Sequence, residues 1–213
     1  MNKKLGILLV ACFASLAFAQ DENKIFRVRL INVAPNDDSS QILDTGTSVA
    51  VDDAIVPEVD LTYMFNDNWG LEVIAATSPH DLSTQNGALA GANAGEVWVL
   101  PPTLTLQYHF GFNQPIDFYA GLGLNYTLFY NYDLSADLEG LGVTDIDFDG
   151  SFGLAANLGV DFKINEKWLF NIDLKYIDIG TDAELQLAGK AVLDTVSVDV
   201  DPMVASIGMG FRF

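Results

Sequence analysis

The last eleven residues, MVASIGMGFRF (203–213), constrain the fold more than any other stretch because their character alternates with a period of two. Alternate side chains of an extended strand point to opposite faces. One face here is small or polar, and the other carries Met203, Ala205, Ile207, Met209, Phe211 and Phe213. A soluble edge strand with so much apolar surface would be an aggregation hazard. The pattern therefore favours a strand whose apolar face contacts lipid.

This stretch resembles the closing strand of a bacterial outer-membrane β-barrel. Such strands carry a polar residue, then glycine, then two aromatic or apolar residues before a free C-terminus. Ser206, Gly208, Phe211 and Phe213 fit that spacing. The resemblance implies that these four residues form an assembly signal that the barrel-assembly machinery reads, which makes this machinery an expected partner.

The N-terminus has the pattern of a secretory signal peptide. Lys3 and Lys4 precede an apolar run, and Ala17 and Ala19 form a small-x-small cleavage site before Gln20. We therefore predict a signal peptide over 1–19 and a barrel over 20–213. The segment LVAC, ending at Cys12, also fits a lipoprotein cleavage box, but the apolar core before it is short, so cleavage after Ala19 is favoured.

The composition of the mature chain excludes several classes of function. Removing residues 1–19, which contain Lys3, Lys4 and no acidic residue, changes the formal charge from −19 to −21. So acidic a chain lacks the basic footprint that nucleic-acid phosphates require. We therefore expect no nucleic-acid partner. The mature chain also has no cysteine and no metal-ligand spacing, so we expect no metal or other cofactor.

The alternation seen at the C-terminus recurs along the chain. Strands are predicted at 24–34, 54–65, 69–77, 98–110, 117–128, 151–163, 168–176 and 203–213. Long polar loops (35–53, 78–96, 130–147 and 180–201) alternate with short turns between these strands. The sequence FNDNW (65–69) is echoed by INEKW (164–168), which places a Trp after two of the turns as an interfacial anchor.

These strands predict an all-β fold, an eight-stranded antiparallel up-and-down transmembrane β-barrel with short periplasmic turns and four longer external loops. No mature segment reaches the roughly 18 apolar residues of a membrane helix, and closed barrels are the other structure that satisfies every backbone group in lipid. A soluble barrel such as a lipocalin would bury its apolar side chains inside, whereas here the second face is polar. We expect an integral protein of a Gram-negative outer membrane.

Seven short segments of the mature chain are similar to the OmpW family. They are INVAPN (31–36), TYMFNDNWGLE (62–72), LPPTL (100–104), GLGLNY (121–126), SFGL (151–154), YIDI (176–179) and VDP (200–202). Met203 departs from the family, which commonly has Trp there, and this affects an expected anchor at the outer rim rather than the fold.

The resemblance implies a narrow, largely apolar passage for small hydrophobic molecules across the outer membrane. Some members are also reported as bacteriocin or phage receptors, so the alternative is a non-transporting structural or receptor barrel that works through its external loops. The expected partners are outer-membrane lipid, lipopolysaccharide and a small hydrophobic solute. We expect a monomer.

The inward face of the predicted barrel is polar. An eight-stranded barrel is normally filled by its own side chains, and unpaired buried charge is costly. We therefore expect a hydrogen-bonded network rather than a water-filled pore, although the inward glycines should leave some volume. The predicted lumen residues are Glu58, Asp60, Thr105, Gln107, Gly121, Gly123, Asn125, Gly153, Asn157, Asp161, Asp173 and Lys175.

Pro101 and Pro102 lie near the outer end of the predicted fourth strand. Proline cannot donate to a β-ladder, so the pair could interrupt strand pairing and open the wall laterally. The alternative is that both residues only mark where a loop becomes a strand.

Catalysis would require a nucleophile, a base and an orienting acid brought together. His80 lies beside Ser78 and Asp81 in a predicted loop, where such residues are common in turns. We therefore expect no enzyme. The acidic runs at 37–38, 52–53 and 145–149 could bind divalent cations that bridge lipopolysaccharide, or could simply be solvated loop faces.

Overall fold

The computed structural model describes residues 23–42, 45–140, 142–188 and 191–213. The predicted signal peptide, with Ala17, Ala19 and Gln20 and the alternative site at Cys12, lies outside the described residues.

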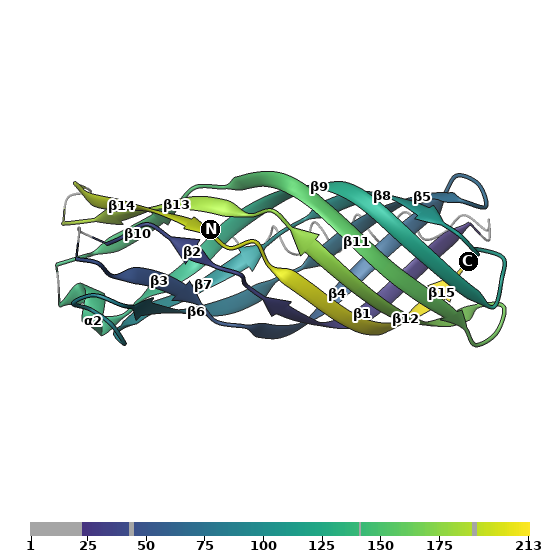
Figure 1. Ribbon diagram of the computed structural model, residues 1–213, viewed down its shortest axis with the longest axis horizontal. Helices are drawn as coiled ribbons and strands as arrows, with labels where there is room; N and C mark the ends of the chain where they lie inside the picture. Colours follow the sequence, from purple (N-terminus) through teal and green to yellow (C-terminus); the bar gives the residue numbers. More distant parts are fainter. Residues whose placement is uncertain (1–22, 43–44, 141, 189–190) are drawn as a thin grey trace.

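Eight antiparallel strands close into the predicted barrel (Figure 1). They are β1 (Lys24–Ala34), β4 (Ala54–Met64), β5 (Trp69–Ala76), β8 (Thr103–His109), β9 (Ile116–Leu134), β11 (Ser151–Lys163), β12 (Trp168–Ile177) and β15 (Met203–Arg212). β15 pairs with both β12 and β1, and β11 pairs with both β9 and β12, so the ring has no free edge. Backbone bonds between Lys24 and Phe213 join the two ends of the described chain at one end of the barrel.

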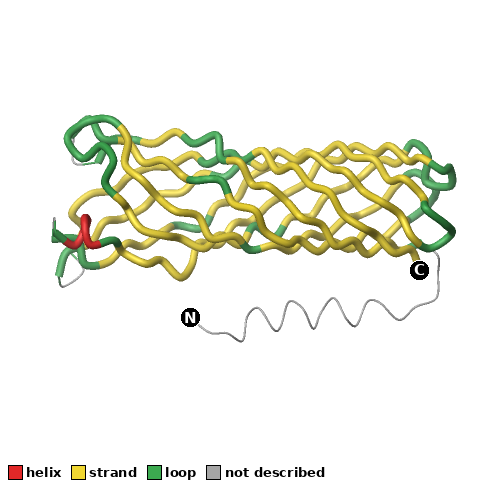
Figure 2. The backbone as a smooth tube through the Cα atoms, turned by 90° about the horizontal axis from the view of Figure 1, so that it is seen from below, coloured by secondary structure: helices red, strands yellow, loops and turns green. Residues whose placement is uncertain are grey.

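The predicted long loops are largely strands, and this part of the prediction is wrong. They contain all or part of β2 (Asp38–Ser39), β3 (Ser48–Val51), β6 (Ser78–Gln85), β7 (Asn93–Leu100), β10 (Asp145–Phe148), β13 (Gly180–Gln186) and β14 (Val192–Asp199), with the short helix α2 (Ala136–Glu139). These strands form two sheets, β3-β6-β7-β9 and β10-β13-β14-β2, which continue the wall beyond the lipid-facing barrel (Figure 2). We call this part the extension.

The predicted fourth strand, 98–110, is two strands. Pro101 and Pro102 separate β7 from β8. The chain is extended on both sides of the prolines, but along one edge β7 pairs with β6 whereas β8 pairs with β5. The missing backbone N–H groups of the two prolines explain the break.

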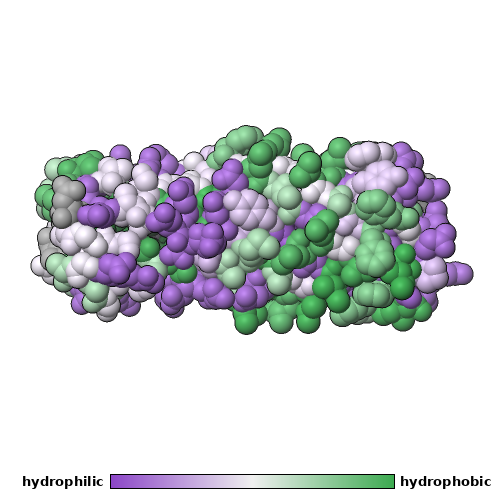
Figure 3. Space-filling model, in the orientation of Figure 1, coloured by the Kyte–Doolittle hydropathy of each residue, from purple (hydrophilic) through white to green (hydrophobic). Residues whose placement is uncertain are grey.

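The outer face of the eight-stranded barrel is apolar. Leu122 and Leu154 are 74% and 63% exposed, and the hydrophobic surface gathers over the right half of the molecule in Figure 3, whereas the extension is mostly polar. Aromatic rings meet at the turn end, where Trp69 packs edge-on against Tyr108 and Trp168 against Phe211. An apolar band edged by aromatic residues is the surface of an outer-membrane barrel. Within the described residues no helix is long and apolar enough to cross a membrane.

The two echoed turns have the same local structure. The side-chain oxygen of Asn66 accepts hydrogen bonds from the backbone N–H groups of Asn68 and Trp69 at 2.9 and 3.0 Å. The oxygen of Asn165 accepts from Lys167 and Trp168, both at 2.9 Å. An asparagine that binds the backbone two residues ahead closes a tight turn, so each Trp starts its strand at the level of the aromatic band.

Candidate functional site: an apolar cavity above a polar plug

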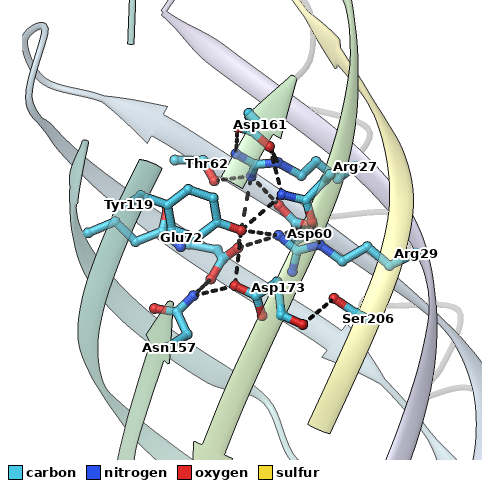
Figure 4. A network of polar contacts seen from close by, with 12 residues as sticks. Arg27, Arg29, Asp60, Thr62, Glu72, Tyr119, Asn157, Asp161, Asp173 and Ser206 are labelled. Atoms are coloured by element: carbon cyan, nitrogen blue, oxygen red, sulfur yellow. Dashed lines mark hydrogen bonds and ion pairs between the residues drawn. The ribbon is translucent and has the colours of Figure 1, made fainter. Parts of the chain in front are cut away.

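Two fully buried arginines of β1 are at the centre of the barrel interior (Figure 4). They point inward because Val28 and Leu30 occupy the lipid-facing positions of the same strand. The guanidinium of Arg27 donates to Asp60 at 2.9 Å and to Asp161 at 2.6 Å. Arg27 therefore ties β1 to β4 on one side and to β11 across the barrel.

Arg29 occupies the next inward position. It donates to Glu58 at 3.0 Å, to Glu72 at 3.1 Å and to the amide oxygen of Asn171 at 2.8 Å. Lys175 of β12 donates to the same Glu58 carboxylate at 3.2 Å. Charge-assisted hydrogen bonds of this kind hold the buried ions in place, because each charge would be costly without its partner.

Tyr119 fills the space between these groups. Its hydroxyl donates to Asp173 at 2.9 Å, and its ring lies 5.5 Å from the Arg27 guanidinium and stacks on His109. His109 binds Asp117 at 2.7 Å, so the network continues to the turn end of the barrel. We call this assembly the polar plug, defined by Arg27, Arg29, Glu58, Asp60, Glu72, Tyr119, Asn157, Asp161, Asn171, Asp173 and Lys175.

The plug includes residues that the predicted lumen set lacks. Arg27, Arg29, Glu72 and Tyr119 are all buried at its centre. The signal was present in the alternation, because Arg27 and Arg29 are the polar positions between the apolar residues of the first strand.

The predicted lumen residues lie inside the barrel at different levels. Glu58, Asp60, Asn157, Asp161, Asp173 and Lys175 belong to the plug. The amide oxygen of Gln107 lies 3.2 Å from a ring nitrogen of His109, and Asn125 donates to Thr103 at 2.9 Å. Thr105 is buried beside Gly121 and Gly123.

The expectation that inward glycines leave open volume is wrong. A Cβ added at Gly121 would approach the amide oxygen of Asn157 to 2.4 Å, and one at Gly153 would meet the backbone carbonyl of Asp178 at 2.0 Å. A Cβ at Gly123 would lie 2.5 Å from the carbonyl of Leu104. A neighbouring group therefore already occupies the space beside each of these glycines.

Beyond the plug the interior becomes apolar. A cavity of ≈ 90 Å³ lies between the plug and the two sheets of the extension. Its wall includes Ile31, Val33, Leu82, Val97 and Phe129, and its few lining residues with a polar side-chain group are Glu58, Ser78, His80, Thr103, Tyr132, Lys175 and Thr181. The cavity is therefore closed below by charged groups and surrounded by side chains that suit a hydrophobic molecule.

The break at Pro101 and Pro102 borders this cavity, because Pro101 is one of the lining residues. The β5–β8 ladder ends where Ile74 pairs with Thr103, and the β6–β7 ladder begins where Ser78 pairs with Val99. In the described structure, residues 75–77 and 100–102 have no strand partner across this seam. Pairing on the opposite side is kept, since the backbone N–H of Tyr126 donates to the carbonyl of Pro102 at 3.1 Å.

Ser78 and His80 face the cavity together from β6. The Ser78 hydroxyl lies 2.8 Å from Nε2 of His80, and Nδ1 lies 2.8 Å from the backbone carbonyl of Asp52. Asp81 is exposed and does not orient the ring. Burial lowers the pKa of His80, while the Asp52 carbonyl and the carboxylates of Asp52, Asp53 and Asp81 oppose this shift.

Three residues of the predicted assembly signal lie along β15, and the fourth, Phe213, directly follows it. Ser206 is buried and donates to the carbonyl of Asp173 at 3.4 Å, and Gly208 lies against Arg29. Phe211 stacks on Phe213 in the aromatic band. Reading by the barrel-assembly machinery, contact with lipopolysaccharide and a monomeric state stay predictions.

Comparisons with known proteins agree with this architecture. The family model described as OmpW family matches residues 20–213. Outer membrane protein W of Vibrio cholerae serotype O1 is 36% identical over 213 residues, which cover 98% of this chain and 97% of the relative. The crystal structure of the outer membrane protein OprG from Pseudomonas aeruginosa has a TM-score of 0.82 at 36% identity, over 89% of this chain and 95% of that one. A more distant relative, the dibenzothiophene metabolism operon protein PahQ of Pseudomonas aeruginosa, is 28% identical and covers 95% of this chain and 94% of its own length.

Proposed function

Because this chain belongs to the OmpW family of outer-membrane barrels, we propose that it carries small hydrophobic molecules into the outer membrane through a narrow lateral passage. The observation that carries the proposal is the position of the apolar cavity, which is closed below by the polar plug and bordered by the ladder break at Pro101 and Pro102.

The physical chemistry of the interior favours a lateral route over an axial one. Apolar surface moved from water into the cavity contributes about 25 cal/mol per Å². An apolar solute moving further down the axis would separate Arg27 and Arg29 from their carboxylates, which costs several kcal/mol for each uncompensated buried charge. A solute leaving past Pro101 would instead enter hydrocarbon directly. The name of PahQ, which refers to the metabolism of an apolar aromatic compound, supports this solute class.

The test is uptake of a small hydrophobic probe into liposomes that contain the refolded protein. A Pro101→Thr, Pro102→Thr variant restores the two backbone N–H donors and is expected to seal the seam. The matched control is Pro115→Thr, at an exposed turn position on the opposite end of the barrel. We expect the wild type and the control to accelerate uptake and the double variant to lose the acceleration.

Uptake no faster than that of empty liposomes would instead favour the second candidate, a structural or receptor barrel. The polar plug favours this candidate specifically, because it closes the barrel without any contribution from the extension.

We propose binding and passage without catalysis at Ser78 and His80. The pair has the spacing of a nucleophile and a base, but the orienting group is a backbone carbonyl rather than a carboxylate. Hydrolysis of a chromogenic acyl ester that a Ser78→Ala variant abolishes would contradict this proposal.

A further inference from the structure

The hydroxyl of Ser78 offers a hydrogen-bond acceptor to the cavity. The backbone carbonyl of Asp52 can only accept, so the Nδ1 of His80 donates to it. In the neutral ring Nε2 is then an acceptor, and the Ser78 hydroxyl donates to it. The proton of Ser78 is therefore committed to the protein, while the oxygen lone pairs stay available on a side chain that is 4% exposed.

The other three hydroxyls of the lining, those of Thr103, Thr181 and Tyr132, are committed in the same way, and that of Tyr132 donates to the carbonyl of Ala94. Thr103 donates to the carbonyl of Pro101 at 2.9 Å and already accepts from Asn125. Thr181 donates to the carbonyl of Asp149 at 2.7 Å. The ammonium of Lys175, the cation at the cavity floor, is paired with Glu58. The hydroxyl groups that face the cavity therefore present acceptors to a solute.

The charges around the cavity also favour a solute that donates hydrogen bonds or carries positive charge. The polar plug beneath it contains three cations, Arg27, Arg29 and Lys175, and five carboxylates, Glu58, Asp60, Glu72, Asp161 and Asp173. The described parts of the extension, taken as residues 35–42, 45–53, 77–100, 129–140, 142–150, 178–188 and 191–201, contain Asp and Glu but no Lys or Arg. Fields of one sign at the mouth of a low-dielectric cleft attract opposite charge and repel like charge.

From these two observations we propose that the solute is an apolar molecule whose single polar group donates hydrogen bonds or is cationic, such as an alcohol, a phenol or an alkylammonium. Apolar carboxylates of the same size are excluded. The inference rests on the proposed function, since it names the solute class of the same cavity.

The test compares four probes that share one ring: methylcyclohexane, cyclohexylmethanol, cyclohexylmethylammonium and cyclohexanecarboxylate. Binding is measured near neutral pH and at low salt to the full chain in nanodiscs, and the signal of empty nanodiscs is subtracted. One neutral hydrogen bond corresponds to about a fivefold change in affinity. We expect the alcohol to bind about fivefold more tightly than the hydrocarbon, the ammonium to bind at least as tightly as the alcohol, and the carboxylate to bind most weakly.

Two variants separate the hydroxyl from the charge. Ser78→Ala should lower the affinity for the alcohol to that for the hydrocarbon, and the control Ser83→Ala, on the same strand but facing the other way, should change neither. A triple variant, Asp52→Asn, Asp53→Asn and Asp81→Asn, should narrow the gap between the ammonium and the carboxylate, as should high salt.

The measurements distinguish failure of this inference from failure of the proposed function. A carboxylate that binds as tightly as the alcohol at low salt, or a Ser78→Ala variant that keeps its preference for the alcohol, overturns this inference while leaving hydrophobic binding intact. If not even methylcyclohexane binds above the empty nanodiscs, the proposed function fails and the inference fails with it.

Discussion

Arg29 illustrates how single side chains hold the barrel interior together. It contacts groups from β4, β5 and β12 at once, through Glu58, Glu72 and Asn171. A hydrophobic side chain of equal volume could fill the space, but it would leave carboxylates buried without a partner. Arg29 therefore stabilises the fold mainly by pairing with these buried carboxylates, rather than by filling space.

We expect Arg29→Ala to reduce the free energy of unfolding by about 3–5 kcal/mol, the usual cost of removing one partner from a buried ion pair. The measurement is urea-induced unfolding of the protein refolded into lipid vesicles. The control is Lys167→Ala, which removes one positive charge from an exposed turn and should cost less than about 1 kcal/mol. Equal effects of the two variants would contradict an ion network at the core of the plug.

His80 makes stability depend on pH. Its folded-state pKa is lowered, chiefly by burial, from an ordinary value of 6.5. The unfolded chain then binds more protons than the folded chain between the two pKa values, so stability rises with pH there. We expect the stabilisation to be present above about pH 6.5 and to be lost as the pH falls through the lower folded-state pKa.

The check is the pH dependence of the unfolding midpoint for wild type and for His80→Gln. The two proteins share every other titratable group, so the difference between them isolates the imidazole. If the unfolding midpoint changes equally with pH in both proteins below pH 6.5, His80 is not buried as a neutral ring.

At the scale of elements, the lipid-facing strands were predictable and the extension was not. In β11 and β15, and in β1 as far as Leu30, lipid enforces apolar residues at every second position, so the period of two is clear in the sequence. In β6 and β14 the outward face meets water and the inward face mixes Ser, His, Thr and Val, so the composition is that of a loop. Pairing with distant segments, which a local pattern cannot show, makes these residues strands.

The two Asn-closed turns give a prediction at this scale. Asn66→Ala and Asn165→Ala each remove an oxygen that accepts two backbone N–H groups. Because both turns are exposed, water replaces part of the loss, and we expect each variant to cost about 0.5–1.5 kcal/mol. Unfolding in urea measures this, with Glu166→Ala as a control in the same turn. A control that costs as much as Asn165→Ala would assign the effect to the turn surface rather than to the capping oxygen.

For the whole molecule, the polar interior could be predicted from the sequence, but its division into two compartments could not. Alternation places Glu58, Asp161 and Lys175 inside, and the cost of unpaired charge then predicts a network. The apolar cavity depends on residues such as Val97, Val196 and Val198, which meet only when the two sheets of the extension pack together. Pro101 was identifiable as a break, but its position on the cavity wall follows from the fold.

The two compartments predict how the whole barrel treats water-soluble solutes. Any axial path must cross the plug, where Tyr119 and the arginines occupy the interior and adding even a Cβ at Gly159 would bring it within 2.2 Å of the Tyr119 ring. We therefore expect liposomes containing the protein to swell in glucose no faster than empty ones, and planar bilayers to show no stable open channel.

A wide-pored porin in the same lipid is the positive control for both measurements, and uptake of a hydrophobic probe by the same preparation shows that the barrel is folded and active. Hydrophobic uptake without glucose permeation is the combination that a lateral passage requires, because a solute that leaves through the wall never meets the plug. Glucose permeation at the porin's rate would mean that the plug opens, and the passage would then run along the axis.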